Sequence, residues 1–372
     1  MAHPSAVRSQ SNERLFSLDV YRGLVMTLLI AEGAGVYEAL HGLGSPWAVA
    51  VAGQFMHPAY EGFTFWDLVQ PAFMFIVGVS MVFSMRKRAE RGDGWGKRFR
   101  HILTRCVILF VLGTGLHCVY AGELVWELWN VLTQLSVTIL IAFLVMYWPA
   151  AAQLAVSLAL IGVTDLAYRF IHVAPYGQTF AAGANFGSYV DMLLMGKLNT
   201  DHLVAINCIP TAAHTIWGVL AGRVLIGRGS VNRKAAKIAT WGVFALVVGY
   251  GMNLAGVAPM IKRICTSPYV IASGGWCVLA LAFFYWVIDG LGFRRGGWVV
   301  AVVGTNSILI YLIAESLAYS WLNPTVGIFV EGALGWVNVT GPTAALVNAL
   351  VVWALLWGLC YWLYTKRAFV KV

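Results

Sequence analysis

A histidine and an aspartate ten residues apart form the pair in this sequence with the clearest catalytic potential. His57 lies in a loop, and Asp67 lies in the first turns of the apolar segment that follows it. Aromatic residues surround both positions, so we expect a partly dry site. An imidazole there exchanges a proton near neutral pH, and a carboxylate within reach holds its tautomer and stabilises the imidazolium. The alternative interpretation is a surface or interface histidine.

Ionisable side chains inside apolar segments are a second source of candidates, because a charge at membrane depth is costly and usually functional. Two of them, Asp165 and Asp289, lie near segment ends, and an interfacial or inter-helix hydrogen bond explains both. Glu315 is placed where it could border a cavity. Glu32 is flanked by Ala31, Gly33, Ala34 and Gly35, whose small size lets another group approach closely.

The composition places most of the chain in lipid. Of its 372 residues, 60% are hydrophobic and 11% are charged, against common values of about 45–50% and about 25%. A soluble fold of this length cannot bury that much apolar surface. A soluble enzyme, a disordered chain and a nucleic-acid module are therefore excluded, and no nucleic-acid partner is expected.

The apolar segments predict an all-α integral membrane protein with a bundle of about ten transmembrane helices, since each span needs about 20 apolar residues. Alternating polarity of the kind that a barrel lumen requires is not evident. We expect one transmembrane domain over 18–365, between tails at 1–17 and 366–372. The expected spans are 18–40, 63–85, 102–121, 129–148, 152–172, 209–227, 238–258, 269–291, 297–322 and 343–365.

The basic residues predict how this bundle is oriented. The net charge is +9, and ten spans place 21 of the 25 lysines and arginines on the side that holds both termini. Cationic loops resist translocation, so both termini are expected in the cytoplasm, with the protein in the cell inner membrane. The six cysteines show no CxxC spacing, and we expect neither a metal site nor a disulfide framework.

Five blocks in order resemble a known family. Segment 17–23 (SLDVYRG) matches a start of the form S-x-D-x-[FY]-R-G, and segments 57–62 (HPAYEG) and 67–80 match H-x-x-W-x-G and the D-L-V-F-P block. Segment 201–222, and the two stretches 285–289 and 304–311, resemble its central and closing blocks. The chain thus resembles the heparan-alpha-glucosaminide N-acetyltransferase family of transmembrane acyltransferases, especially its bacterial members. Tyr60 and Gln70 depart from the family pattern.

The resemblance implies transfer of an acetyl group from cytoplasmic acetyl-CoA to an amino sugar or glycan on the far side of the membrane. It makes His57 the catalytic residue, as a base or as an acetyl carrier, with Asp67 orienting it. Glu32 is the third expected catalytic residue: either it takes over the polar function of a family asparagine that falls at Gly33 here, or it belongs to a different acceptor site. Basic side chains are expected to hold the phosphates of CoA, and asparagines to contact its pantetheine arm or thioester. The expected cofactor-binding residues are Arg22, Arg86, Arg88, Arg98, Arg105, Asn130 and Asn306.

Other functions fit parts of the same pattern. A transporter or flippase would also use polar groups at membrane depth, although no inverted repeat is evident. An O-acyltransferase of cell-envelope glycans would use the same donor, and a membrane scaffold subunit would leave the His57–Asp67 pair without a purpose. The expected partners are acetyl-CoA, the extracytoplasmic sugar acceptor and the lipid bilayer, and a homodimer is left open.

Overall fold

The protein is an all-helical bundle, which confirms the expected fold class. The structure, a computed structural model, describes residues 15–370, and within that range no strand occurs. Seven helices or helix runs of the described chain are long and apolar enough to cross a membrane. They are η1–α4 (Phe65–Leu68 and Val69–Glu90), α5 (Trp95–Ala121), α7 (Ala150–Phe170), η2–α9 (Ala205–Asn207 and Cys208–Ile226), α10 (Val231–Leu254), α11–η3 (Ser267–Phe284 and Tyr285–Gly290) and α15 (Pro342–Thr365).

Two further spans are sharply bent, where continuous helices were expected over 18–40 and 297–322. The first pair is bent by 57° and the second by 77°. Gly35 adopts φ +75° at the first break, which glycine does at little cost. At the second break, the backbone of Asn306 is not helical, and its side chain bonds the backbone of Ala368 and Val370. The elements are α1 (Phe16–Gly33) and α2 (Val36–Gly42), then α12 (Gly297–Gly304) and the run of α13 (Ser307–Ile313), η4 (Ala314–Leu322) and α14 (Asn323–Gly335).

The remaining expected span, 129–148, contains a helix that is shorter than the span. α6 (Val131–Val145) has 15 residues, about 22 Å at 1.5 Å per residue, whereas the hydrocarbon core is about 30 Å thick. Most of its residues are buried among other helices. Pro149 caps the start of α7 and separates the two helices at the expected place. Two more short helices, α3 (Pro46–Gly53) and α8 (Phe186–Met195), lie in connecting segments.

Glycines hold α4 and α9 in direct backbone contact. A Cβ at Gly78 would overlap the carbonyl oxygen of Thr215, and one at Gly218 would overlap that of Phe75. Small residues permit this close approach between membrane helices, where van der Waals packing and not hydrophobic exclusion drives association. The contact fixes the helix that follows Asp67 against the centre of the bundle.

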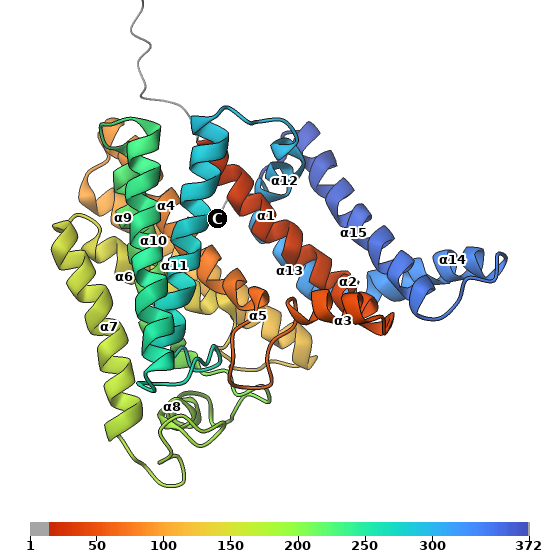
Figure 1. The fold of residues 1–372 in the computed structure, drawn as a ribbon, viewed down its shortest axis with the longest axis horizontal. Helices are drawn as coiled ribbons and strands as arrows, with labels where there is room; N and C mark the ends of the chain where they lie inside the picture. The colour runs from red at the N-terminus through yellow and green to blue at the C-terminus, as the bar shows by residue number, and fades with distance from the viewer. Residues whose placement is uncertain (1–14, 371–372) are drawn as a thin grey trace, which may run out of the picture.

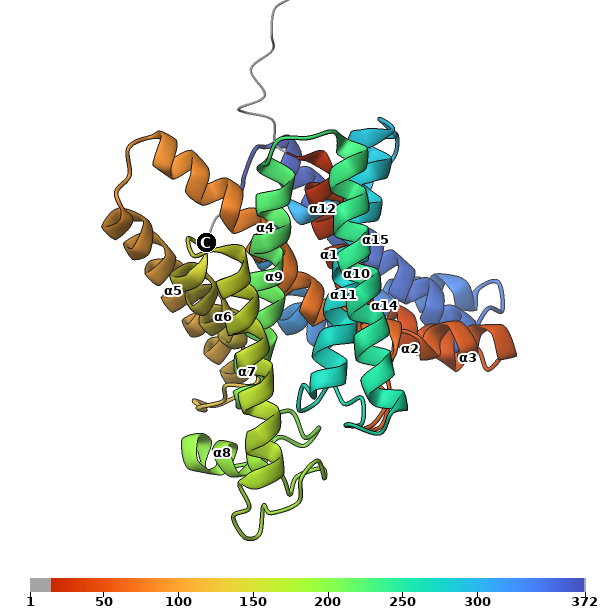
Figure 2. The ribbon, with the colours of Figure 1, turned by 60° about the vertical axis from the view of Figure 1, so that its left-hand side comes forward.

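The connecting segments divide between the two ends of the bundle. α1 begins and α15 ends at the upper end of Figures 1 and 2, where the α4–α5, α9–α10 and η3–α12 connections also lie. We call this the basic end, because its connections carry most of the lysines and arginines. The segment between α3 and η1, the segments on either side of α8 and the α10–α11 connection lie at the opposite end, which we call the His57 end.

Candidate active site

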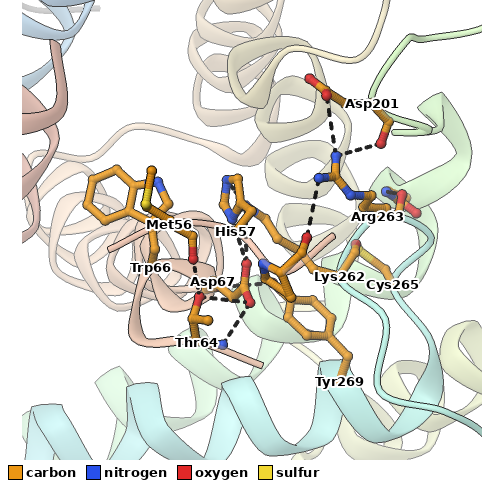
Figure 3. Close-up of polar contacts among 12 residues, drawn as sticks. Met56, His57, Thr64, Trp66, Asp67, Asp201, Lys262, Arg263, Cys265 and Tyr269 are labelled. Atoms are coloured by element: carbon orange, nitrogen blue, oxygen red, sulfur yellow. Dashed lines mark hydrogen bonds and ion pairs between the residues drawn. The ribbon is translucent and has the colours of Figure 1, made fainter. Parts of the chain in front are cut away.

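His57 and Asp67 lie in direct contact at the His57 end. Nδ1 of His57 lies 2.7 Å from Oδ1 of Asp67, and Figure 3 shows the two side chains directed toward each other. The Asp67 side chain is fully buried, whereas 36% of the His57 side chain is exposed. An ionised carboxylate only accepts hydrogen bonds, so Nδ1 carries the ring proton and Nε2 presents its lone pair.

Local sequence holds the Asp67 carboxylate in place. Asp67 is the third residue of the 3₁₀ turn η1, and Thr64 caps that turn. The backbone N–H of Thr64 donates to Oδ2 of Asp67 at 2.9 Å, and the Thr64 hydroxyl lies 3.3 Å from the same oxygen. This capping box satisfies one carboxylate oxygen. The other oxygen is thereby left for His57.

Lys262 completes the site, and the sequence analysis did not select it. Its Nζ lies 3.0 Å from Nε2 of His57 and 3.8 Å from Oδ1 of Asp67. It belongs to the α10–α11 connection, 205 residues from His57. One signal was available: Lys262 and Arg263 are two of only four cationic residues on the side expected to be extracytoplasmic. Cations are disfavoured there, so such a pair has a reason to be retained.

The surroundings keep the His57 imidazole uncharged. Burial is the largest influence and lowers the pKa of His57 from its ordinary 6.5, because the charged ring loses hydration. The hydrogen bond that Nδ1 of His57 donates to Asp67 opposes this shift, and the charges of Lys262 and Arg263 add to it. Burial also lowers the pKa of Lys262, while the carboxylate of Asp67 raises it again.

Arg263 joins three connecting segments around the site. Its guanidinium donates to the carbonyl oxygens of Asp201 and, at 3.4 Å, of Pro58. Its own carbonyl oxygen accepts from the side chain of Asn207 at 2.8 Å. Figure 3 shows Arg263 directed away from His57, toward Asp201. Arg263 therefore holds the connecting segments around the site together, while Lys262 faces the imidazole.

Glu32 bonds the turn that carries Asp67. The indole N–H of Trp66 donates to Oε1 of Glu32 at 3.1 Å, and Trp66 precedes Asp67 in η1. Glu315 accepts a hydrogen bond from the hydroxyl of Tyr120 at 2.7 Å. The structure thus places Glu32 next to the site, where it bonds Trp66 and not His57 or Asp67 within the described residues.

The two aspartates near span ends make the inter-helix hydrogen bonds that explained them in the sequence. Oδ1 of Asp165 on α7 accepts from the hydroxyl of Ser267 on α11 at 3.0 Å. Asp289 accepts from the backbone N–H of Ser17 on α1 at 3.4 Å. Each carboxylate therefore has a structural role between two helices.

The five arginines expected to bind a cofactor differ in their surroundings. Arg86 and Arg88 pair with nearby carboxylates, at 2.9 Å and 3.5 Å, next to the α4–α5 connection. Arg98 donates to the hydroxyl of Tyr147, and Arg22 donates to that of Ser80 at 2.6 Å. Nε of Arg98 and Nε of Arg105 are both buried and have no hydrogen-bond partner within residues 15–370. Two members of the set thus have an unused buried donor, and Arg98 already donates through another nitrogen, to Tyr147.

The two expected asparagines have structural partners. Asn130 caps α6 by accepting from the backbone N–H of Leu132 at 2.8 Å, and its amide donates to the hydroxyl of Tyr311 at 3.3 Å. Asn306 holds the segment that follows α15. Within the described range, no three histidine, cysteine, aspartate or glutamate side chains form a group that could hold a metal ion.

Comparison with known proteins identifies the family. A family model described as heparan-alpha-glucosaminide N-acetyltransferase, catalytic, matches residues 14–255, so the chain belongs to this family. Heparan-alpha-glucosaminide N-acetyltransferase of Mus musculus is 25% identical over 377 residues, covering 84% of this chain and 55% of the relative. The protein of that name from Homo sapiens is 24% identical over 365 residues, covering 80% and 52%. The chain spans about half the length of the curated relatives it matches.

Proposed function

We propose that this member of the heparan-alpha-glucosaminide N-acetyltransferase family is a transmembrane acetyltransferase of the inner membrane. It would move an acetyl group from cytoplasmic acetyl-CoA to an amino sugar or glycan on the other side. The observation that carries the proposal is the 2.7 Å contact between His57 and buried Asp67 at one end of the bundle. The basic end lies opposite, and the positive-inside rule assigns it, with both termini, to the cytoplasm.

The geometry of His57 supports two routes for the acetyl group. In the first, Nε2 accepts the proton of the acceptor amine or hydroxyl while that group attacks the thioester carbonyl. The carbon–sulfur bond breaks, and the imidazolium returns the proton to the CoA thiolate. In the second, Nε2 itself attacks the carbonyl and forms acetyl-imidazole with release of CoA, and the acceptor then removes the acetyl group. In both routes Asp67 holds the ring through Nδ1.

Arginines of the basic end supply the charge that acetyl-CoA needs. Its phosphates suit guanidinium groups, which bind them by paired hydrogen bonds. Arg98 and Arg105 each have an unused buried Nε, and Arg98 already donates to Tyr147 through another nitrogen, so Arg105 is the member that we expect to gain a partner. Arg22, Arg98, Arg86 and Arg88 would contribute to the same field. Asn130 and Asn306 would contact the pantetheine arm or thioester only by exchanging their present hydrogen bonds.

The test uses sealed inside-out vesicles with the protein in the membrane. Acetyl-CoA labelled in the acetyl group is added outside, and amino sugars or glycan fragments are trapped inside. We expect label on the trapped acceptor with the wild type and none with His57→Asn, which keeps the ring's approximate size but removes the basic nitrogen. Label on hydroxyl acceptors alone would redirect the proposal to O-acylation. Acceptor flux that needs no acetyl-CoA would overturn it in favour of transport.

A further inference from the structure

We propose that Lys262 is a positioning residue for His57, whose ammonium lies against the ring and keeps the imidazole uncharged until the acceptor arrives. The inference rests on the proposed function and adds a residue beyond the stretch that the family model matches, which ends at residue 255. Figure 3 shows the side chains of Lys262 and Asp67 both beside the imidazole.

Charge and distance determine which ring state fits beside these neighbours. Asp67 accepts the proton of Nδ1, at 2.7 Å, so the lone pair of the neutral ring is on Nε2. Nζ of Lys262 lies 3.0 Å from Nε2 and 3.3 Å from Nδ1, so the ammonium lies beside both ring nitrogens and not in line with the Nε2 lone pair. A positive charge this close disfavours a second positive charge on the ring. The arrangement therefore favours neutral His57, the form that both routes require.

The backbone delivers Lys262 to this position. The turn that contains it closes on itself, because the hydroxyl of Thr266 accepts from the N–H of Ile261 at 3.0 Å and donates to the carbonyl oxygen of Pro259 at 2.8 Å. The N–H of Gly62 donates to the carbonyl oxygen of Met260 at 2.9 Å. The loop of His57 and the turn of Lys262 are thus hydrogen-bonded to each other at the backbone.

The charges around His57 agree with this role. Asp67 faces it from η1, Lys262 faces it from the α10–α11 connection, and Arg263 from that same connection acts on it while bonding Asp201. Glu61 belongs to the loop of His57, and Glu32 on α1 lies beyond Trp66. Burial and the two cations thus lower the pKa of His57, and the carboxylate of Asp67 offsets only part of that shift.

Lys262 leaves room for the acceptor. Its ammonium lies near both ring nitrogens and so does not occupy the lone pair of Nε2, which an attacking amine or hydroxyl needs. Oδ1 of Asp67 lies 3.8 Å from Nζ, so a small side-chain movement brings the ammonium to a charged partner as the ring becomes positive. The Lys262 side chain is 14% exposed, so its charge stays largely unscreened by water near the ring.

The first measurement is the pH dependence of acetyl transfer by Lys262→Met, Lys262→Gln and Lys262→Arg. Without the Lys262 cation, the pKa of His57 rises. The acid limb of kcat/KM is therefore expected to move to higher pH in the Met and Gln variants. The loss relative to wild type should reach about three- to tenfold at pH 6 and shrink at pH 8. Lys262→Arg should keep the limb in place. A merely structural lysine would lower the rate equally at every pH, which would overturn the inference.

The second measurement needs no acetyl transfer. Diethyl pyrocarbonate reacts with neutral imidazoles, and mass spectrometry of peptides from the purified protein reports its addition to His57 separately from exposed His41. We expect the midpoint of the His57 reaction to move to higher pH in Lys262→Met and Lys262→Gln, with His41 unchanged. An unmoved midpoint in folded variants refutes the role of Lys262, even if the enzyme transfers acetyl groups. A moved midpoint in a protein without transferase activity supports the role of Lys262 and refutes the proposed function.

Discussion

The hydroxyl of Tyr269 on α11 donates a hydrogen bond to the backbone carbonyl oxygen of Asp67 at 2.8 Å. Both residues are fully buried, and they are 202 positions apart in the chain. The residue that holds His57 is therefore fixed from two directions, by the Thr64 cap on its side chain and by α11 on its backbone. This second attachment links the candidate active site to the centre of the bundle.

Replacement of Tyr269 by phenylalanine tests that link. Tyr269→Phe leaves a buried carbonyl oxygen unpaired, which costs about 1–3 kcal/mol, so the midpoint of thermal unfolding in detergent should fall. Tyr21→Phe is the matched control, because that hydroxyl bonds a carbonyl oxygen of Cys277 at a longer 3.4 Å, and it should cost less. Equal midpoints for Tyr269→Phe and the wild type would show that the bond contributes nothing.

Replacement of Asp67 by asparagine tests the orientation of the ring. An amide can donate to Nδ1 and so stabilise the wrong tautomer, and it leaves Lys262 without its anionic neighbour. We expect kcat to fall about a hundred- to ten-thousand-fold, with a small change in the KM for acetyl-CoA. Asp201→Asn is the control: its carboxylate is 71% exposed, and its main bond to Arg263 uses the backbone. A fall of similar size in the control would remove the special role of Asp67.

The acid side of the pH–rate profile reports His57 in the wild type. Both routes use the neutral ring, and burial lowers its pKa below the ordinary 6.5. On acidification, kcat/KM should therefore fall with a midpoint below pH 6.5, as the ring takes up a proton. Initial rates between pH 5 and 8 in detergent measure this. A midpoint above pH 6.5 contradicts the arrangement described for His57.

Substitutions of two arginines near the basic end distinguish a role in acetyl-CoA binding from a role in membrane orientation. Arg105 has a buried Nε without a partner in the described chain, whereas Arg86 pairs with Glu90 at the surface. We expect Arg105→Gln to raise the KM for acetyl-CoA about tenfold with little change in kcat, because a charged hydrogen bond is worth about 1.5–3 kcal/mol. Arg86→Gln removes only a surface charge that is already paired, so it should raise the KM for acetyl-CoA much less than Arg105→Gln does. Identical effects of the two changes would mean that these arginines set membrane orientation alone.

A methyl group at Gly78 tests the contact between α4 and α9. The Cβ of alanine would overlap the carbonyl oxygen of Thr215, so Gly78→Ala must push the helices apart. Overpacking of this kind costs about 1–3 kcal/mol, read as a lower unfolding midpoint and reduced transfer. Gly115→Ala on α5 is the control, since its Cβ would meet no heavy atom within 4 Å in the described structure. Unchanged stability of Gly78→Ala would contradict the close packing.

The sequence was informative where function depends on neighbours in the chain. His57 and Asp67 are ten residues apart on a loop and the turn that follows it, so their contact depends mainly on local geometry. The helical fold could also be predicted from the sequence, because a run of about 20 apolar residues in lipid forms a helix rather than a loop or an open strand. The break at Asn306 was not accessible, because it depends on hydrogen bonds to Ala368 and Val370, about 60 positions away.

Lys262 shows the same limit at the site itself. No periodicity or motif connects it to His57, and only the closed turn around Thr266 and the bond from Gly62 to Met260 bring the two together. The sequence also singled out Glu32, an exposed acid that bonds the turn of Asp67, and its expected role in catalysis stays a prediction. Its partner, Trp66, could not be predicted, because indole and carboxylate meet through the packing of α1 against η1.

The family match stops at residue 255, yet Lys262, Arg263 and Tyr269 all lie beyond it. A protein truncated at that boundary would retain His57 and Asp67. It would lose the Lys262 cation beside them, the Arg263 bonds between connecting segments and the hydrogen bond from Tyr269 to the backbone of Asp67. The smallest fragment worth purifying therefore extends at least through α11. Genome surveys that compare chains over the matched stretch alone would also group together proteins with and without this lysine.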